Sequence, residues 1–370
     1  MLTFDFQKRT SKILRRLRIL GTLYSDKNNT FCFNLYLIYT IVVNIYYNLH
    51  NIAQAANIFY HYDDLDELTS SGLLTIMETL TNVKAYYVVT NKSRILKINN
   101  MVQKWSFQPK NSRQEEMAKY TFKIFDVMSL LHTLGPTLTV VFFGCYPIAE
   151  MKTNKKLPFS AWYPYDYKIS PLFEITYFHQ LSSSLIMAHI HINSDCLAYN
   201  LIAIIIVQLD FLADNLKNVN NNIKSNLGNF EKERNIAFLD CVKHHKDILS
   251  CFNEVYKILN INLLGQFVVS TTSLCLTSLQ LSTVNPTSTH FMALMVYELA
   301  VLVQLLMFCW WGNELIFKSQ QIPQAAFESD WIEASIPFKK SIMFFIQQTQ
   351  KPLTLYAVDF FTISLTSFAL

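Results

Sequence analysis

Residues 291–311 read FMALMVYELAVLVQLLMFCWW, an almost unbroken apolar stretch in which Glu298 is the only charged residue. A helix needs about 20 mostly apolar residues to cross the hydrocarbon core of a bilayer. We therefore interpret this stretch as a transmembrane helix, and similar windows identify six more candidates. These are Phe31–Ile52, Leu68–Thr90, Phe122–Pro147, Leu197–Leu212 with an upstream extension, Leu259–Leu281 and Pro352–Leu370.

The composition agrees with a membrane protein. Of the 370 residues, 51% are hydrophobic and only 16% are charged, which is too apolar for an ordinary soluble protein. Two candidate spans are weaker than the rest, because one contains Glu78 and Lys84 and the other contains Asp359. The net charge of +4 would hint at nucleic acid in a soluble chain, but here the basic residues sort by loop. No nucleic-acid partner is predicted.

The basic residues set the expected orientation. Lysine and arginine number seven before the first span, none in the next loop, and then seven, four, seven, none and four in the loops that follow. Cytoplasmic loops carry the excess of lysine and arginine. The sequence therefore predicts an all-α, multi-pass protein of seven transmembrane helices with its N terminus in the cytoplasm.

Helical patterns extend beyond the membrane. The segment from Pro171 to about Asp214 reads as one helix of some 40 residues, about 60 Å long and twice the hydrocarbon thickness. Apolar residues recur at helical spacing over 238–259 and again over 331–345. We expect a cytoplasmic helical layer in which subunits pack together. The alternative is that these amphipathic helices lie on the lipid surface.

The residues that could catalyse a reaction or bind a metal do not have the spacing that such sites require. His189 and His191 stand two apart, which points their side chains in diverging directions, and the adjacent His244 and His245 straddle a polar edge. With only seven glycines and no phosphate loop or nucleophile motif, we predict neither an enzyme nor a metal site, and no cofactor. The seven cysteines imply no disulfide framework.

Polar groups in the outer halves of two spans suggest a ligand pocket. Polar side chains within spans tend to face a protein interior or a cavity, and here they mix with aromatic walls. Gly135 and Pro136 would bend the third span beside them. The alternative is that these groups only hold helices together. The candidate ligand-binding residues are His132, Gly135, Thr139, Tyr177, Gln180, Ser184, Met187, Phe291 and Met295.

Four ordered motifs resemble the insect odorant receptor family. The loop before the fourth span reads LPFSAWYPYDYKISPLFEITYFHQ (Leu157–Gln180). The last third contains CWWGNEL (Cys309–Leu315), AAFESDWI (Ala325–Ile332) and KPLTLYAVDFFTISL (Lys351–Leu365). These stretches are similar to the family in order and spacing, whereas the first 150 residues resemble it only in their span pattern.

The resemblance implies a tuning odorant receptor. Such a subunit binds small volatile molecules and forms, with a co-receptor, a hetero-tetrameric odorant-gated cation channel in the plasma membrane of a sensory dendrite, in contact with lipid. We expect a cytoplasmic tail over 1–30, the membrane domain over 31–316, an anchor helix over 317–350 and a pore helix over 351–370. The implied anchor residues are Trp311, Phe327, Trp331 and Phe338, and the implied pore residues are Thr362, Thr366 and Leu370.

Family members usually continue several helical turns beyond the position of Phe368. We therefore expect a truncated sequence, or a co-receptor that supplies most of the gate. Two other functions stay open. A transporter would use buried groups such as His179, His189 and Glu298 to relay protons, although the internal repeats common in transporters are absent. A receptor coupled to a G protein would need the opposite orientation.

Overall fold

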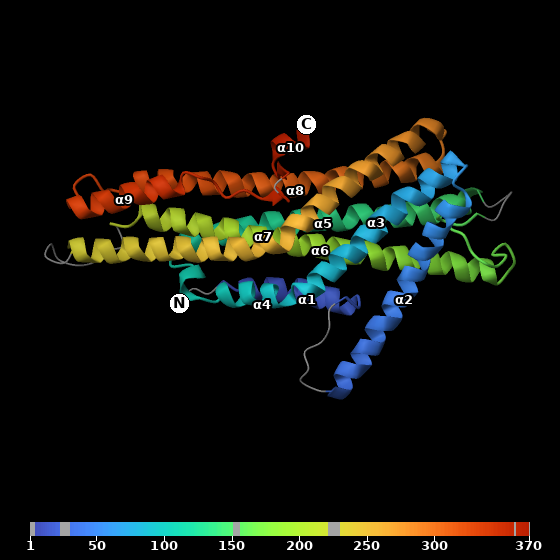
Figure 1. Ribbon diagram of the computed structural model, residues 1–370, viewed down its shortest axis with the longest axis horizontal. Coiled ribbons are helices and arrows are strands. Elements are labelled where there is room, and N and C mark those ends of the chain that lie inside the picture. Colours follow the sequence, from blue (N-terminus) through green and yellow to red (C-terminus); the bar gives the residue numbers. More distant parts are fainter. Residues whose placement is uncertain (1–3, 23–29, 151–155, 221–229, 359, 370) are drawn as a thin grey trace.

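The computed structural model describes residues 4–22, 30–150, 156–220, 230–358 and 360–369. Most of its long helices run along one axis and form an elongated bundle, which α2 (Thr30–Tyr60) crosses obliquely (Figure 1). The helices are α1 (Phe6–Ile19), α2 (Thr30–Tyr60), α3 (Leu65–Thr90), α4 (Lys92–Met101), α5 (Ser112–Glu150), α6 (Leu172–Lys217), α7 (Phe230–Thr283), α8 (Thr289–Phe327), α9 (Ile336–Thr349) and α10 (Leu365–Ala369), with a short 3-10 turn η1 (Trp105–Phe107).

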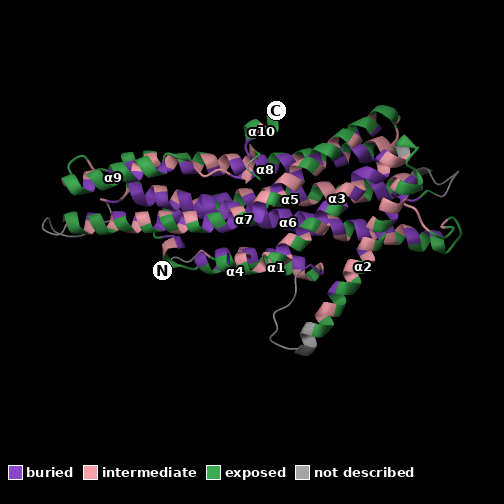
Figure 2. Ribbon diagram, viewed as in Figure 1, coloured by how far each residue is buried: buried purple, intermediate pink, exposed green. Residues whose placement is uncertain are grey.

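The long helix predicted from Pro171 is confirmed. Helix α6 has 46 residues, which is roughly 69 Å at 1.5 Å per residue. From Ile190 to Leu209 every residue is buried (Figure 2). Six other helices, α1, α2, α3, α5, α7 and α8, contact α6, which therefore forms the core of the bundle.

Four of the described helices, α5, α6, α7 and α8, are long and apolar enough to cross a membrane. Helix α7, with 54 residues, joins the predicted amphipathic cytoplasmic segment to the fifth span without a break. The span quoted at the outset lies in α8, which begins where Ser288 Oγ accepts a hydrogen bond from the backbone N–H of Phe291. Helix α3 is less apolar than α8, as expected for a span that includes Glu78 and Lys84.

The predicted helix over 317–350 is wrong as a single element. Helix α8 continues to Phe327, residues 328–335 are not helical, and α9 then begins after Ser335. Pro337 lies in the first turn of α9, where its missing N–H costs nothing and its fixed backbone angle favours a helix start. Helix α9 lies beside the end of α8 (Figure 1).

Two of the four implied anchor residues are also placed differently from the expectation. Trp311 and Phe338 are buried inside the chain, at 0% and 2% exposure, so their side chains cannot reach another subunit. Trp311 lies against Phe125 of α5, and Phe338 lies against Phe238 of α7. Phe327 is 66% exposed and Trp331 is half-buried, so these two remain available for contact.

The predicted pore helix over 351–370 is wrong for residues 351–364. This segment is extended and contains the antiparallel strands β1 (Tyr356–Ala357) and β2 (Phe361–Thr362), with Tyr356 opposite Thr362. Pro352 opens it, and Val358 between the strands has a positive φ that a helix does not permit. Helix begins only at Leu365, in α10.

Candidate ligand cavity and the polar cluster beneath it

A cavity of about 100 Å³ lies between α3, α5, α6 and α8. Most of its wall is apolar, and Phe159 contributes to it from the loop before α6. A mostly apolar cavity with a few convergent polar groups is the usual form of a small-molecule site. Its lining residues are Leu74, Met77, Glu78, Thr81, Pro136, Thr139, Val140, Phe159, Ser184, Met187, Ala188, His191, Tyr297, Ala300, Val301 and Gln304.

Three of the nine candidate ligand residues line this cavity. They are Thr139 on α5 and Ser184 and Met187 on α6, all of them buried. Pro136 lines it as well, so the proline singled out in the third span faces the cavity from within α5. Gly135 does not line it, because a Cβ there would lie 3.1 Å from Cβ of Ala300, where α5 packs closely on α8.

The other five candidates do not line the cavity. Gln180 fixes the loop that contains Phe159. Its side-chain oxygen accepts a hydrogen bond from the backbone N–H of Phe159 at 3.1 Å, and its side-chain nitrogen donates one to the carbonyl oxygen of Phe159 at 3.0 Å. The Tyr177 hydroxyl donates to the carbonyl oxygen of Gly144. Phe291 lies in the first turn of α8, Met295 is 45% exposed, and His132 lies below the cavity.

Sequence reasoning missed the ionisable residues of the cavity, Glu78 and His191. Glu78 appeared only as a weakness of the second span, and His191 only as an unsuitable metal ligand. Both are buried. Ionisable residues within a membrane span are costly and therefore usually face a protein interior or a cavity. This rule could have identified both residues from the sequence. Glu78 lies on the cavity wall, where Asn51 donates to its carboxylate at 3.4 Å and His50 Nε2 lies 3.8 Å away.

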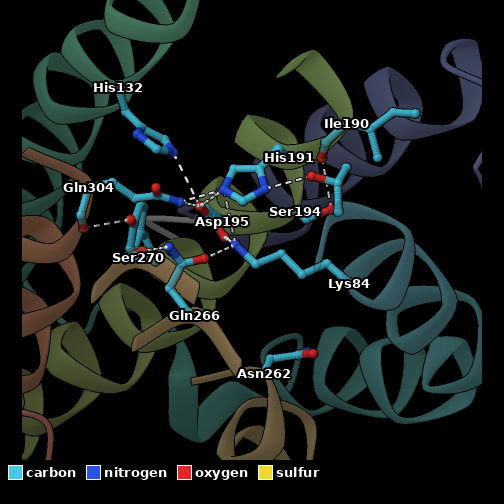
Figure 3. Close-up of polar contacts among 12 residues, drawn as sticks. Lys84, His132, Ile190, His191, Ser194, Asp195, Asn262, Gln266, Ser270 and Gln304 are labelled. Atoms are coloured by element: carbon cyan, nitrogen blue, oxygen red, sulfur yellow. Dashed lines mark hydrogen bonds and ion pairs between the residues drawn. The ribbon is translucent and has the colours of Figure 1, made fainter. Parts of the chain in front are cut away.

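A buried polar cluster forms the floor of the cavity (Figure 3). At its centre, Lys84 Nζ lies 2.5 Å from Asp195 Oδ1, and Gln304 Nε2 donates to Asp195 Oδ2 at 2.5 Å. Lys84 also donates to Gln266 on α7. His132 Nε2 lies 3.4 Å from Asp195 Oδ2. The cluster therefore connects α3, α5, α6, α7 and α8.

The two charges of this cluster compensate each other. An isolated charge in a low-dielectric interior costs many kcal/mol, whereas a paired and hydrogen-bonded charge is tolerated. Asp195 has Lys84 and Gln304 as close partners, and Lys84 has Asp195 and Gln266. The cluster can therefore stay ionised within the bundle.

His191 and Gln304 belong to both the cavity and the cluster. Each lines the cavity, His191 Nδ1 lies 2.9 Å from the Thr81 hydroxyl, and Gln304 Nε2 lies 2.5 Å from His191 Nε2. His191 and Gln304 therefore connect the wall of the cavity to the Lys84–Asp195 ion pair.

The structure describes two of the three predicted pore residues, and neither lines the cavity. Thr362 is in β2 and half-buried, Thr366 is exposed on α10, and Leu370 lies outside the described residues. Among the residues that the structure places, no three His, Cys, Asp or Glu side chains gather closely enough to hold a metal ion.

The comparisons with known proteins agree with one another. A family model described as 7tm Odorant receptor matches residues 64–370. Odorant receptor 67a of Drosophila melanogaster is 26% identical over 67% of this chain and 60% of its own length, and putative odorant receptor 92a of the same species is 22% identical over 94% and 87%. An odorant receptor coreceptor of Aedes albopictus is 27% identical over 41% and 33%.

The fold is similar to that of a solved receptor. The insect olfactory receptor OR5 of Machilis hrabei, solved in complex with eugenol, has a TM-score of 0.85 at 16% identity, covering 99% of this chain and 96% of that one. The chain spans about 60% of the length of odorant receptor 67a and 57% of putative odorant receptor 85d of Drosophila melanogaster.

Proposed function

The chain belongs to the seven-transmembrane odorant receptor family, and we propose that it binds a small volatile molecule and forms, with a co-receptor, an odorant-gated non-selective cation channel. The observation that supports this most directly is the apolar cavity between α3, α5, α6 and α8. Phe159 lines it from the loop before α6, and most of its wall is apolar. Small, mostly apolar volatiles match such a site.

The cavity accounts for ligand selection. Apolar contacts with Met77, Met187 and Val301 favour size and shape, and such contacts discriminate by only about 1–3 kcal/mol per methylene. The polar floor at His191 and Gln304 adds hydrogen-bonding groups for a ligand oxygen. We therefore expect broad tuning among homologues and a preference for ligands with one polar end.

Helix α8 lines the cavity and also contacts the C-terminal segment. Tyr297 and Gln304 face the cavity, and two turns further along α8 Gly312 packs directly on Ile363. A ligand opens a channel only by binding the open state better than the closed state. Ligand-dependent repacking of α8 would shift the segment that contains the proposed pore residues Thr362, Thr366 and Leu370.

The proposed partner is an odorant co-receptor in the plasma membrane of a sensory neuron dendrite. Odorant receptor coreceptors are among the relatives. We propose that two aromatic residues contact a neighbouring subunit: Phe327, exposed at the end of α8, and Trp331, half-buried in the link to α9. Exposed aromatic side chains are enriched at protein interfaces.

Whole-cell current tests the proposal. Cells expressing the chain together with an insect co-receptor are exposed to a panel of volatiles, and cells with the co-receptor alone are the control. Volatile-evoked current beyond that of the control supports the proposal. No added current for any volatile, with surface expression of both proteins established, would contradict it.

A further inference from the structure

We propose that the groove between α1 and the inner halves of α5 and α6 binds an anionic phospholipid of the cytoplasmic leaflet. The groove has a volume of about 850 Å³, within the range of about 300–1,000 Å³ that ligand sites occupy. One side is α1, and the other is formed by residues of α5 from Phe125 to Thr133 and of α6 from His189 to Cys196.

Helix α1 has two distinct faces. Its buried face contains Phe6, Thr10, Ile13 and Leu17. Lys8, Lys12 and Arg16 follow one another at intervals of four residues, so they lie along one stripe of the helix, and all three are exposed beside the groove. The basic stripe of α1 therefore borders the groove.

Most of the charge in the groove is positive and uncompensated. Arg9 pairs with Asp126 at 3.0 Å, and the Asp5 carboxylate accepts from the backbone N–H of Lys8 at 2.7 Å. In the described part of the chain, Lys8, Lys12 and Arg16 form no ion pair with a carboxylate. Three cations are therefore free to contact an anionic group.

The groove changes from basic to apolar along its length. The start of α1 lies at the predicted cytoplasmic end of α5, where the Phe4 and Phe122 rings stack at 5.4 Å. Thr10 is bonded to Asn200, whereas Leu20 packs in the cluster of Met187 and Ile190, so α1 runs antiparallel to α6 and rises into the membrane.

The far end of the groove is lined by Ile19, Leu20 and Leu130. The basic residues thus lie nearer the cytoplasm and the apolar residues deeper in the membrane. This order matches a phospholipid with its phosphate at the interface and its acyl chains inside.

The position of the groove favours lipid over a neighbouring subunit. Helix α1 lies on the other side of the bundle from α8, α9 and α10, where the subunit contacts are proposed (Figure 1). The cytoplasmic leaflet carries anionic lipids, and basic pockets between transmembrane helices on that side bind their head groups.

Native mass spectrometry of the purified full chain tests this inference. The chain is kept in zwitterionic detergent micelles with equal amounts of dioleoylphosphatidylserine and dioleoylphosphatidylcholine. We expect preferential retention of phosphatidylserine. Each basic residue near a membrane surface contributes about a fivefold preference for anionic lipid, so the variant Lys8→Gln, Lys12→Gln, Arg16→Gln should lower the preference by roughly 100-fold.

Matched variants separate a site from general charge attraction. Lys246→Gln, Lys339→Gln, Lys340→Gln removes the same charge elsewhere and should retain the preference. Leu130→Trp fills the groove without changing charge and should lose phosphatidylserine, whereas Leu131→Trp, at a neighbouring lipid-facing position of α5, should retain it. All of these positions lie outside the buried core, and equal elution profiles and melting temperatures check that the fold is unchanged.

Inorganic phosphate distinguishes the lipid from a free anion. An excess of phosphate that leaves phosphatidylserine bound supports the lipid assignment, and its displacement by phosphate contradicts that assignment. Equal retention of the two lipids by the unchanged chain, or equal losses in the matched variants, would also overturn the inference.

Discussion

Lys84 on α3 and Asp195 on α6 form an ion pair inside the bundle, with Nζ 2.5 Å from Oδ1 and neither side chain more than 4% exposed. The pair lies directly below the proposed ligand cavity, because Asp195 is also bonded to Gln304 on the cavity floor. Lys84 enters the sequence analysis only as a weakness of its span, and Asp195 is not singled out there. In the structure the two residues join the helices that surround the cavity (Figure 3).

Removing one partner of this pair should destabilise the protein strongly. Asp195→Asn leaves the Lys84 ammonium buried without a counter-charge, which costs about 3–5 kcal/mol. We expect a clearly lower melting temperature for the purified protein in detergent. The double variant Lys84→Met, Asp195→Leu removes both charges and should recover most of that loss. A double variant no more stable than Asp195→Asn would show that the charges are not compensating each other.

Shortening Met187 should change the preferred ligand length. Met187 lines the cavity and is 2% exposed, so Met187→Ala enlarges the space available to a ligand. Each additional buried methylene contributes about 0.8 kcal/mol. In dose-response currents for a series of linear alcohols, we expect the optimum to move to a longer chain. Met292→Ala, at a position on α8 that is 51% exposed, is the control and should leave the optimum unchanged.

Gly312 is required for the C-terminal segment to pack on α8. A Cβ at this position would collide with the carbonyl oxygen of Ile363 and lie 2.9 Å from its Cγ2. Gly312→Ala should cost about 1–3 kcal/mol of local packing. Faster hydrogen–deuterium exchange over residues 353–369 is the expected result. Gly72→Ala is the control, because its Cβ meets only Leu276 at 3.6 Å. Equal exchange in the two variants would contradict this role.

The sequence predicted the helices better than the site. The apolar run of α8 and the long helical pattern from Pro171 predict their helices directly, because helical periodicity and span length are properties of the local sequence. Residues 351–364 were misread because an apolar run of about membrane length fits a helix by composition alone, although Pro352 and the turn at Val358 favour an extended hairpin.

The polar cluster could not be read from spacing. Lys84, Asp195, Gln266 and Gln304 come from four helices, and only the packed bundle brings them together. Thr139, Ser184 and Met187 were found because polar and flexible residues on the outer halves of spans tend to face inward. Gln180 was selected by the same rule, yet its bonds support the loop at Phe159.

Acidification should weaken the cytoplasmic packing of His244. Burial lowers the pKa of this imidazole to about 3, from an ordinary value of 6.5, with a smaller contribution from nearby Lys110. His244 Nε2 lies 3.0 Å from Gln208 Oε1. The folded state keeps the ring neutral, so the contribution is complete above about pH 6.5 and is lost as the pH falls towards 3.

At pH 5 the loss is about 2 kcal/mol, because each pKa unit corresponds to about 1.36 kcal/mol. His244→Gln removes this proton uptake and should flatten the fall in melting temperature between pH 6.5 and 5. An equally steep fall in the variant and the unchanged chain would exclude His244 as a source of acid sensitivity.

The central claim is that the cavity between α3, α5, α6 and α8 binds the gating ligand, and two adjacent valines test it most directly. Val140 lines the cavity, whereas Val141 is 53% exposed on the lipid-facing side of α5. Each is replaced by phenylalanine, and dose-response currents are recorded with a co-receptor and an activating volatile.

We predict that Val140→Phe lowers sensitivity at least about tenfold, because even one buried methylene changes binding by about 1–3 kcal/mol, while Val141→Phe leaves it unchanged. Equal dose-response curves for the two variants, at equal surface expression, would contradict the claim and place the ligand elsewhere.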